Sequence, residues 1–292
     1  MRAEVWIIIG IIAYAMFMVW HGFSNFKQTS KSAESFFNAD RGVSSFVLVC
    51  TTAISVYSGL SYYGYPAATY VGGIGYVAAA GCGVSGLFFC LIGYRIWILG
   101  REYGFQTPAD YLRTRYYSEG FGLFVSILLV IFIIPYVAVQ LMTIGSGIVV
   151  TTNGLFPYLP AVFLGTICVS LHIIGGGMKS VAWLDTFHAM LGLSAVYIVV
   201  VYLIFKFFPD GGLVEAASVV MKNPDTAAIL STPGPKGLYD WKGILNMALT
   251  AAVATIVWPH IFMRCYIAKS TKNFRVMSWA LPLAYVLPVF GL

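Results

Sequence analysis

The sequence predicts an all-α fold, a polytopic bundle of membrane-spanning helices. Hydrophobic residues make up 59% of the 292-residue chain and charged residues 10%, against roughly 25% charged in an average soluble domain. The mean hydropathy is +0.83. Apolar runs of about 20 residues recur without the alternation that is typical of a membrane β-barrel. The lipid bilayer is therefore the expected environment of the chain.

Eight apolar segments are candidate spans: Val5–Trp20, Ser45–Tyr70, Ile74–Leu99, Gly122–Val150, Ala161–Ile174, Thr186–Phe208, Trp241–Phe262 and Met277 to the end. The last has only 16 residues, fewer than the roughly 20 that a span needs. We therefore expect a single transmembrane transporter domain over residues 1–292 that is incomplete at its carboxyl end, with further spans beyond Leu292.

Lysine and arginine are distributed unevenly between the two sets of alternating loops. One set holds 12 of them and the other 5. The positive-inside rule then predicts a multi-pass protein of the inner or plasma membrane, with the amino terminus outside. The basic residues form no stripe, so we expect no nucleic acid as a partner.

The second segment is expected to be a broken helix. Hydroxyl side chains gather on it at Thr51, Ser55 and Ser58, and the residues that weaken a helix are Gly59, Gly64 and Pro66. In a membrane, backbone groups freed by a break are tolerated only where protein or a water-filled cavity receives them. Freed carbonyl groups are ligands for a small hard cation, and secondary transporters build ion sites in this way.

A second interruption is predicted in the seventh segment. Small residues and then a proline follow one another there, at Ala251, Ala252, Ala254, Thr255 and Pro259. Transporters made of inverted repeats place broken helices in corresponding positions. Breaks in spans two and seven fit two five-helix repeats after one extra helix, with the second repeat incomplete.

Two connections contain secondary structure of their own. Residues Phe105–Tyr117 predict a short cytoplasmic helix, because Thr107 is suited to the N-cap and Pro108 to the first helical position. The loop Pro209–Asp240 predicts a surface helix over Leu213–Met221 followed by turns. This loop is a candidate outer lid.

Two polar residues within apolar segments have both a functional and a structural interpretation. Asp185 either attracts a cation to the inner mouth or is an interfacial residue at a helix start. Gln140 either binds a polar group of a substrate or forms a hydrogen bond between helices. Residue types alone leave both alternatives open.

Histidine and cysteine residues do not suggest a metal or catalytic centre. His172, His188 and His260 share no helical spacing, and the five cysteines occur singly in or beside apolar segments. We interpret them as interfacial or core residues. Because no nucleophile, base and metal set converges, we expect no enzyme and no organic cofactor.

Four stretches, taken in order, resemble the sodium:solute symporter family over nearly the whole chain. They are the broken-helix stretch FVLVCTTAISVYSGLSYYGYPAATYVGGIGY, the cytoplasmic TPADYLRTRY, the segment GGGMKSVAWLD, and WPHIFMRCYIAKS with its proline and arginine. The resemblance implies a leucine-transporter-like inverted repeat and sodium as the coupling ion.

The resemblance also implies roles for individual residues. The backbone carbonyls of Ile54 and Tyr57 match sodium ligands, while the remaining ligands, hydroxyl groups on a later helix, lie beyond Leu292. Asp185 matches an acid near the inner sodium path. Arg41, Pro259 and Arg264 match gating or structural positions, although Ala39 and Asp40 replace the glycines usual before Arg41.

Departures from the family pattern bear on the substrate. Val56 and Leu60 replace the Asp and Trp of proline transporters, and Ala251 and Thr255 replace a Trp and a Tyr, which argues against proline. The stretch IIPYVAVQ around Gln140 resembles members that move small monocarboxylates. The candidate substrate-binding residues are Val56, Ser58, Leu60, Gln140, Ala251 and Thr255.

The expected function is sodium-coupled symport of a small organic solute, with a monocarboxylate as the first candidate. The alternative is a signalling receptor, in which a transporter-like membrane domain is joined to a sensor kinase after Leu292.

Overall fold

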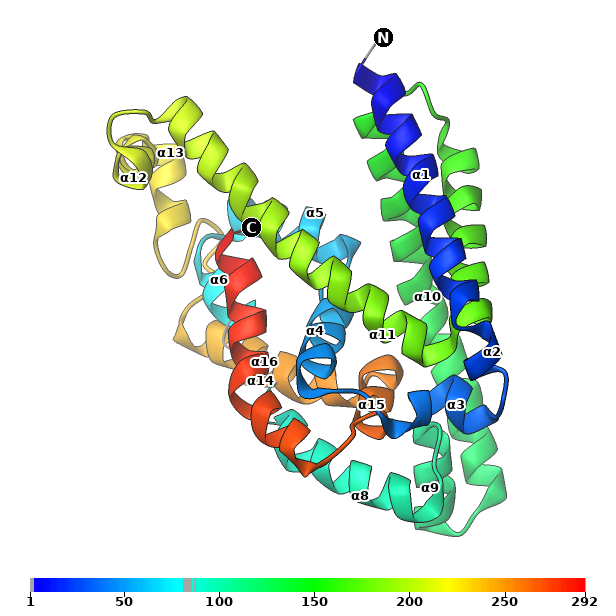
Figure 1. Ribbon diagram of the computed structural model, residues 1–292. Coiled ribbons are helices and arrows are strands. Elements are labelled where there is room, and N and C mark those ends of the chain that lie inside the picture. The colour runs from blue at the N-terminus through cyan, green and yellow to red at the C-terminus, as the bar shows by residue number, and fades with distance from the viewer. Residues whose placement is uncertain (1–2, 81–85, 87, 292) are drawn as a thin grey trace.

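The computed structural model describes residues 3–80, 86 and 88–291 of the chain. Helices dominate these residues. Their bounds are α1 (Ala3–Ser24), α2 (Phe26–Thr29), α3 (Ala33–Asn38), η1 (Ala39–Arg41), α4 (Ser45–Val56), α5 (Gly59–Gly72), α6 (Gly75–Ala80), η2 (Phe89–Gly93), α8 (Tyr94–Tyr103), α9 (Pro108–Tyr116), α10 (Glu119–Thr151), α11 (Tyr158–Phe207), α12 (Gly212–Lys222), α13 (Pro224–Ala227), η3 (Ala228–Leu230), α14 (Trp241–Val257), α15 (Pro259–Tyr266) and α16 (Thr271–Gly291). Figure 1 shows α1 alongside α10 and one arm of α11, whose other arm crosses towards α12.

Within these described residues, three helices are long and apolar enough to cross a membrane, or up to five if each bent pair counts as one span. This is fewer than the eight predicted segments. One reason is α11, which unites the fifth and sixth segments in 50 residues. At about 1.5 Å per residue α11 is far longer than a bilayer core of about 30 Å. It is interrupted at Gly177, where φ is 54° and ψ is −162°.

Two other predicted segments also differ from the structure. Residues 74–99 divide into α6, η2 and α8, and Cys82 lies outside the described residues. The last helix begins at Thr271 instead of Met277, so α16 has 21 residues instead of 16. The polar residues that we assigned to a loop form its first turns.

Both predicted helix breaks are present. Helices α4 and α5 are bent by 56°, and α14 and α15 by 59°. The first break lies at Tyr57 and Ser58, whereas Gly64 and Pro66 lie inside the continuous helix α5. Assigning those two residues to the break was therefore wrong. Ser58 is the N-cap of α5, so it does not continue the helical face of Thr51 and Ser55.

The two connecting helices form as predicted. Thr107 and Asp110 make a capping box at the start of α9, with Pro108 at its first position. Helix α12 occupies the place of the expected surface helix. The end of this outer loop lies against α5 and α6, because the Ile74 N–H donates to the Ile229 carbonyl at 2.7 Å. A lid function for the loop remains a prediction.

The buried core brings the two broken pairs together. Leu48 of α4, Ile261 and Tyr266 of α15, and Met277 of α16 are fully buried in one cluster. A short parallel bridge between Val43 and Ala268 joins the segments that lead into α4 and out of α15. The first broken helix is thereby packed directly against the second.

Helix α1 crosses α11 at a contact too close for a side chain. A Cβ atom added to Gly22 would lie 2.7 Å from the Cα and carbonyl oxygen of His172. Gly175, on the same part of α11, meets the backbone of Gly22 and Phe23. Glycines on both helices therefore allow the two backbones to approach each other this closely.

We expect Gly22→Ala to destabilise the protein by about 1–3 kcal/mol, because the added methyl group collides with rigid backbone. Gly10→Ala is the matched control, since Gly10 lies on the same helix and a Cβ there would meet nothing within 4 Å. Thermal unfolding of both variants in detergent measures the difference. Equal unfolding temperatures would show that α1 and α11 do not make this contact in the protein.

Candidate ion and solute site

The first break redirects the backbone donors that would continue the helix. In an unbroken helix the Ser58 N–H would donate to the Ile54 carbonyl and the Ser61 N–H to the Tyr57 carbonyl. Instead the Ser58 N–H donates to Ser61 Oγ at 3.3 Å, and the Ser61 N–H donates to the Ser58 carbonyl at 2.9 Å. The two carbonyls that match sodium ligands are therefore those that lose their helical donors.

Helix α10 supports the same break from the side. The Gly59 N–H donates to Gln140 Oε1 at 3.1 Å. In an unbroken helix this N–H would donate to the Ser55 carbonyl, so that carbonyl also loses its helical donor. The Tyr136 hydroxyl, one turn before Gln140, donates to that carbonyl at 3.5 Å. Gln140 thus makes a hydrogen bond between helices, and its amide group lies at the break.

A buried ion pair links three helices beside the break. Arg264 Nη2 of α15 lies 3.0 Å from Asp185 Oδ2 of α11, with exposed side-chain fractions of 7% and 19%. Thr51 Oγ1 of α4 donates to the same carboxylate oxygen at 2.5 Å, and Arg264 Nη2 also donates to Ser55 Oγ at 3.0 Å. Asp185 lies two turns beyond the break at Gly177, so it is not a helix-start residue. Charge and hydroxyl groups are here concentrated next to the freed carbonyls.

The second break places a histidine at the first break. Trp258 is extended, with φ −60° and ψ 129°, and Pro259 begins α15 at the position where its missing N–H costs no helical bond. His260 follows and stacks on Tyr136 of α10, with ring centroids 5.3 Å apart. We interpreted His260 as an interfacial or core histidine, and that interpretation missed its position between the two breaks. Its place directly after the interrupting proline was the signal in the sequence.

The six candidate substrate-binding residues do not all come together. Val56, Ser58 and Gln140 meet at the first break. The Thr255 hydroxyl donates to the Ala251 carbonyl of its own helix at 2.6 Å, and Ala251 is exposed. Leu60 lies in α5, but its side chain is outside the described part of the structure.

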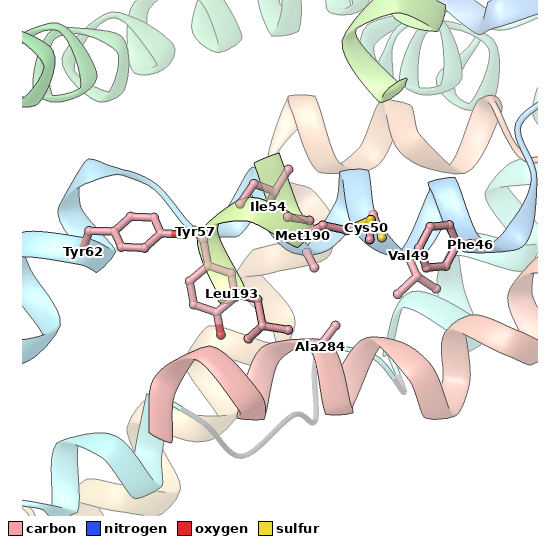
Figure 2. A pocket seen from close by; sticks show the side chains of 11 residues that line it. Phe46, Val49, Cys50, Ile54, Tyr57, Tyr62, Met190, Leu193 and Ala284 are labelled. Atoms are coloured by element: carbon pink, nitrogen blue, oxygen red, sulfur yellow. The ribbon is translucent and has the colours of Figure 1, made fainter. Parts of the chain in front are cut away.

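An apolar cavity of about 250 Å³ lies on the other side of α4. Figure 2 shows Ile54 of α4 and Tyr57 of the break beside Met190 and Leu193 of α11, with Ala284 of α16 across from them. The lining is mostly apolar, so on this side of the break the backbone oxygen atoms are the main candidate ligands for a cation. Among the described residues, no group of three or more His, Cys, Asp or Glu side chains is arranged to hold a metal ion.

Arg41 has partners away from both breaks. Its Nε lies 2.6 Å from Glu34 Oε1, and its Nη2 donates to the Phe105 carbonyl at 3.5 Å. These bonds join the segment before α4 to the segment before α9. A structural role fits this geometry, and a gating role stays a prediction.

Known proteins resemble the chain over most of its length. The model of the "Sodium:solute symporter family" matches residues 36–290. The Bacillus subtilis "Uncharacterized symporter YhjB" is 23% identical over 296 residues, which cover 100% of this chain and 58% of the relative. The "Sodium/pantothenate symporter" of Haemophilus influenzae is 26% identical over 91% of this chain and 54% of the relative. The "Monocarboxylate transport permease protein" of Rhizobium johnstonii is 27% identical over 79% of this chain and 45% of the relative.

The chain spans about half the length of these curated relatives. The family match, in contrast, extends over nearly all of the chain and includes both helix breaks and the buried ion pair. The chain belongs to the sodium:solute symporter family.

Proposed function

We propose that the complete protein couples the inward sodium gradient to uptake of a small organic solute, as a transporter and not as an enzyme. The observation that carries the proposal is the first break, where Ile54 and Tyr57 lose the donors of their carbonyl groups. Carbonyl oxygens of this kind suit a hard monovalent cation. In this proposal residues 1–292 form one transporter domain in the plasma membrane, with the amino terminus outside.

In the proposed mechanism Asp185 lies on the inner sodium path. Its carboxylate is held by Arg264 and Thr51, so a sodium ion leaving the break competes with the guanidinium group for the same oxygen. Because Arg264 is on α15 and Thr51 on α4, a change at this carboxylate moves both broken helices. Arg264 and Pro259 then act as gating residues, and Arg41 braces the cytoplasmic end.

A small carboxylate is the proposed substrate class. Two of the similar proteins are named for pantothenate and for monocarboxylates, and both kinds of molecule carry a carboxylate group. The amino ends of α5 and α15 face the break, and such ends carry partial positive charge. We place the substrate near Val56, Ser58, Leu60 and Gln140, with Ala251 and Thr255 one turn or more from the second break.

Uptake by proteoliposomes tests the proposal. The complete protein is reconstituted, and the initial uptake of radiolabelled lactate, pyruvate and pantothenate is measured with an inward sodium gradient or an equal choline gradient. We expect at least one of these acids to enter about tenfold faster with sodium, and a sodium ionophore to remove the difference. Equal rates with sodium and choline for every acid would refute sodium coupling.

A further inference from the structure

His260 follows the second break and contacts Tyr136 beside the first, and both of its ring nitrogens are buried. Nδ1 and Nε2 are buried and have no hydrogen-bond partner among the described residues. The backbone of Ser55 also approaches the ring, and its carbonyl already accepts from the Tyr136 hydroxyl. Buried polar atoms are nearly always paired, because an unpaired one loses its bonds to water without replacement. An unpaired imidazole in the interior therefore indicates a partner that comes from outside the fold.

The ring is held in a fixed plane. Tyr136 stacks on His260 at a centroid distance of 5.3 Å and an interplanar angle of 20°. Trp258 stacks on it at 5.6 Å and 28°. Stacking uses the faces of the imidazole and leaves its nitrogen-bearing edge for hydrogen bonds. The orientation of the N–H donor is thus set before any ligand arrives.

The surroundings of His260 favour an anionic partner. His260 is in the first turn of α15, where the helix dipole is positive, and Arg264 follows one turn later. Gln140 lies one turn beyond Tyr136 and presents its amide group at the facing break. The nearby acid Asp185 is already engaged by Arg264 and Thr51. The positive end of α15 and the Arg264 guanidinium group would attract a carboxylate to the position of His260.

The geometry points to His260 as a binding residue for the transported solute, with its ring N–H donating a hydrogen bond to a carboxylate oxygen of a small organic acid. Neutral imidazole offers one donor and one acceptor, so the second nitrogen accepts from a hydroxyl group of the solute or from water. The substrate class rests on the proposed function. The bond itself requires no sodium gradient and is measured separately.

Two substitutions separate hydrogen bonding from packing. His260→Phe keeps an aromatic ring against Tyr136 and Trp258 but removes both nitrogens, whereas His260→Gln keeps a donor and loses the stack. His21→Phe is the control, because His21 also stacks on another ring, that of His172, at the contact between α1 and α11. Elution of each variant from a size-exclusion column as a single peak verifies that it folds.

Binding is measured on the complete protein in lipid nanodiscs at equal sodium on both sides, with radiolabelled lactate, pyruvate, acetate and pantothenate, and with lactamide as the neutral counterpart of lactate. We expect His260→Phe to weaken binding of the acid about tenfold or more, because the lost bond has a charged acceptor. His260→Gln should stay within roughly threefold of the wild type, since its amide is still a donor. The dissociation constant for lactamide should change little, whereas a purely structural role would weaken both ligands alike.

Three results would overturn the assignment: acid binding by His260→Phe at wild-type affinity, equal losses for lactate and lactamide, or no binding of any of the acids by the wild type. Failure of the proposed function looks different. There, binding still depends on His260 while uptake ignores the sodium gradient.

Discussion

Sodium-driven uptake falls roughly a hundredfold or more when Asp185 is replaced by asparagine. The carboxylate is the counter-charge of Arg264, whose side chain is only 7% exposed. Breaking a buried ion pair by removing one partner costs about 3–5 kcal/mol, because the other charge stays buried and unpaired. The cost applies to every conformation in which Arg264 is buried beside residue 185, so the populations in the transport cycle shift away from such conformations.

The initial rate of uptake in proteoliposomes measures this loss, together with its dependence on sodium concentration. Asp210→Asn is the matched control, because this carboxylate is exposed and lies after the end of α11. Asp185→Glu keeps the charge and should retain a measurable part of the rate. Wild-type uptake by Asp185→Asn with an unchanged sodium dependence would return the residue to a structural role.

A double variant tests whether the two charges act as a pair. If Asp185 acts mainly by neutralising Arg264, the variant Asp185→Asn with Arg264→Gln should unfold at a higher temperature than either single variant. If Asp185 also lies on the sodium path, the double variant should still fail to respond to sodium. Recovery of folding without recovery of sodium dependence is the expected combination.

The sequence predicted that two helices would break, but it extended the first break too far along the chain. Gly64 and Pro66 weaken a helix locally, and yet both lie within α5. The break occurs instead where Ser61 and Gln140 offer other bonds to the backbone of Ser58 and Gly59. Gln140 is 81 residues from Gly59 in the chain. Local propensity indicates that a helix can be interrupted, and contacts between helices decide at which residue.

Long-range partners were the other part that the sequence did not reveal. Asp185 was a candidate because an acid in an apolar segment is costly. Its partner Arg264 is 79 residues away, and both of its interpretations remained open until the pair was seen. The cap of α9 and the bent pairs were predicted because each has a signal within a few neighbouring residues. His260 had a local signal in its place after Pro259, but its stacking partner Tyr136 on a distant helix left no such pattern.

Gly59→Ala should lower uptake about tenfold or more and destabilise the protein by about 1–3 kcal/mol. A Cβ atom at this position would lie 2.5 Å from the Cβ of Thr143, which is closer than such atoms can approach. Thr143 is on α10, within a turn of Gln140. The methyl group would therefore push α10 away from the break and separate the Gly59 N–H from Gln140 Oε1. Uptake assays and thermal unfolding measure the two effects.

Thr143→Gly makes this prediction specific, because it removes the side chain that the new methyl group would strike. We expect Gly59→Ala combined with Thr143→Gly to recover part of the uptake. The recovery should be incomplete, because a glycine inside α10 destabilises that helix. Gly120→Ala serves as the control on α10, since the nearest atom to an added Cβ is Ser118 Oγ at 4.0 Å. A rescue would show that the close approach of α5 to α10 is what holds the broken helix open. If Thr143→Gly gave no rescue, the loss of uptake would not come from the contact between Gly59 and Thr143.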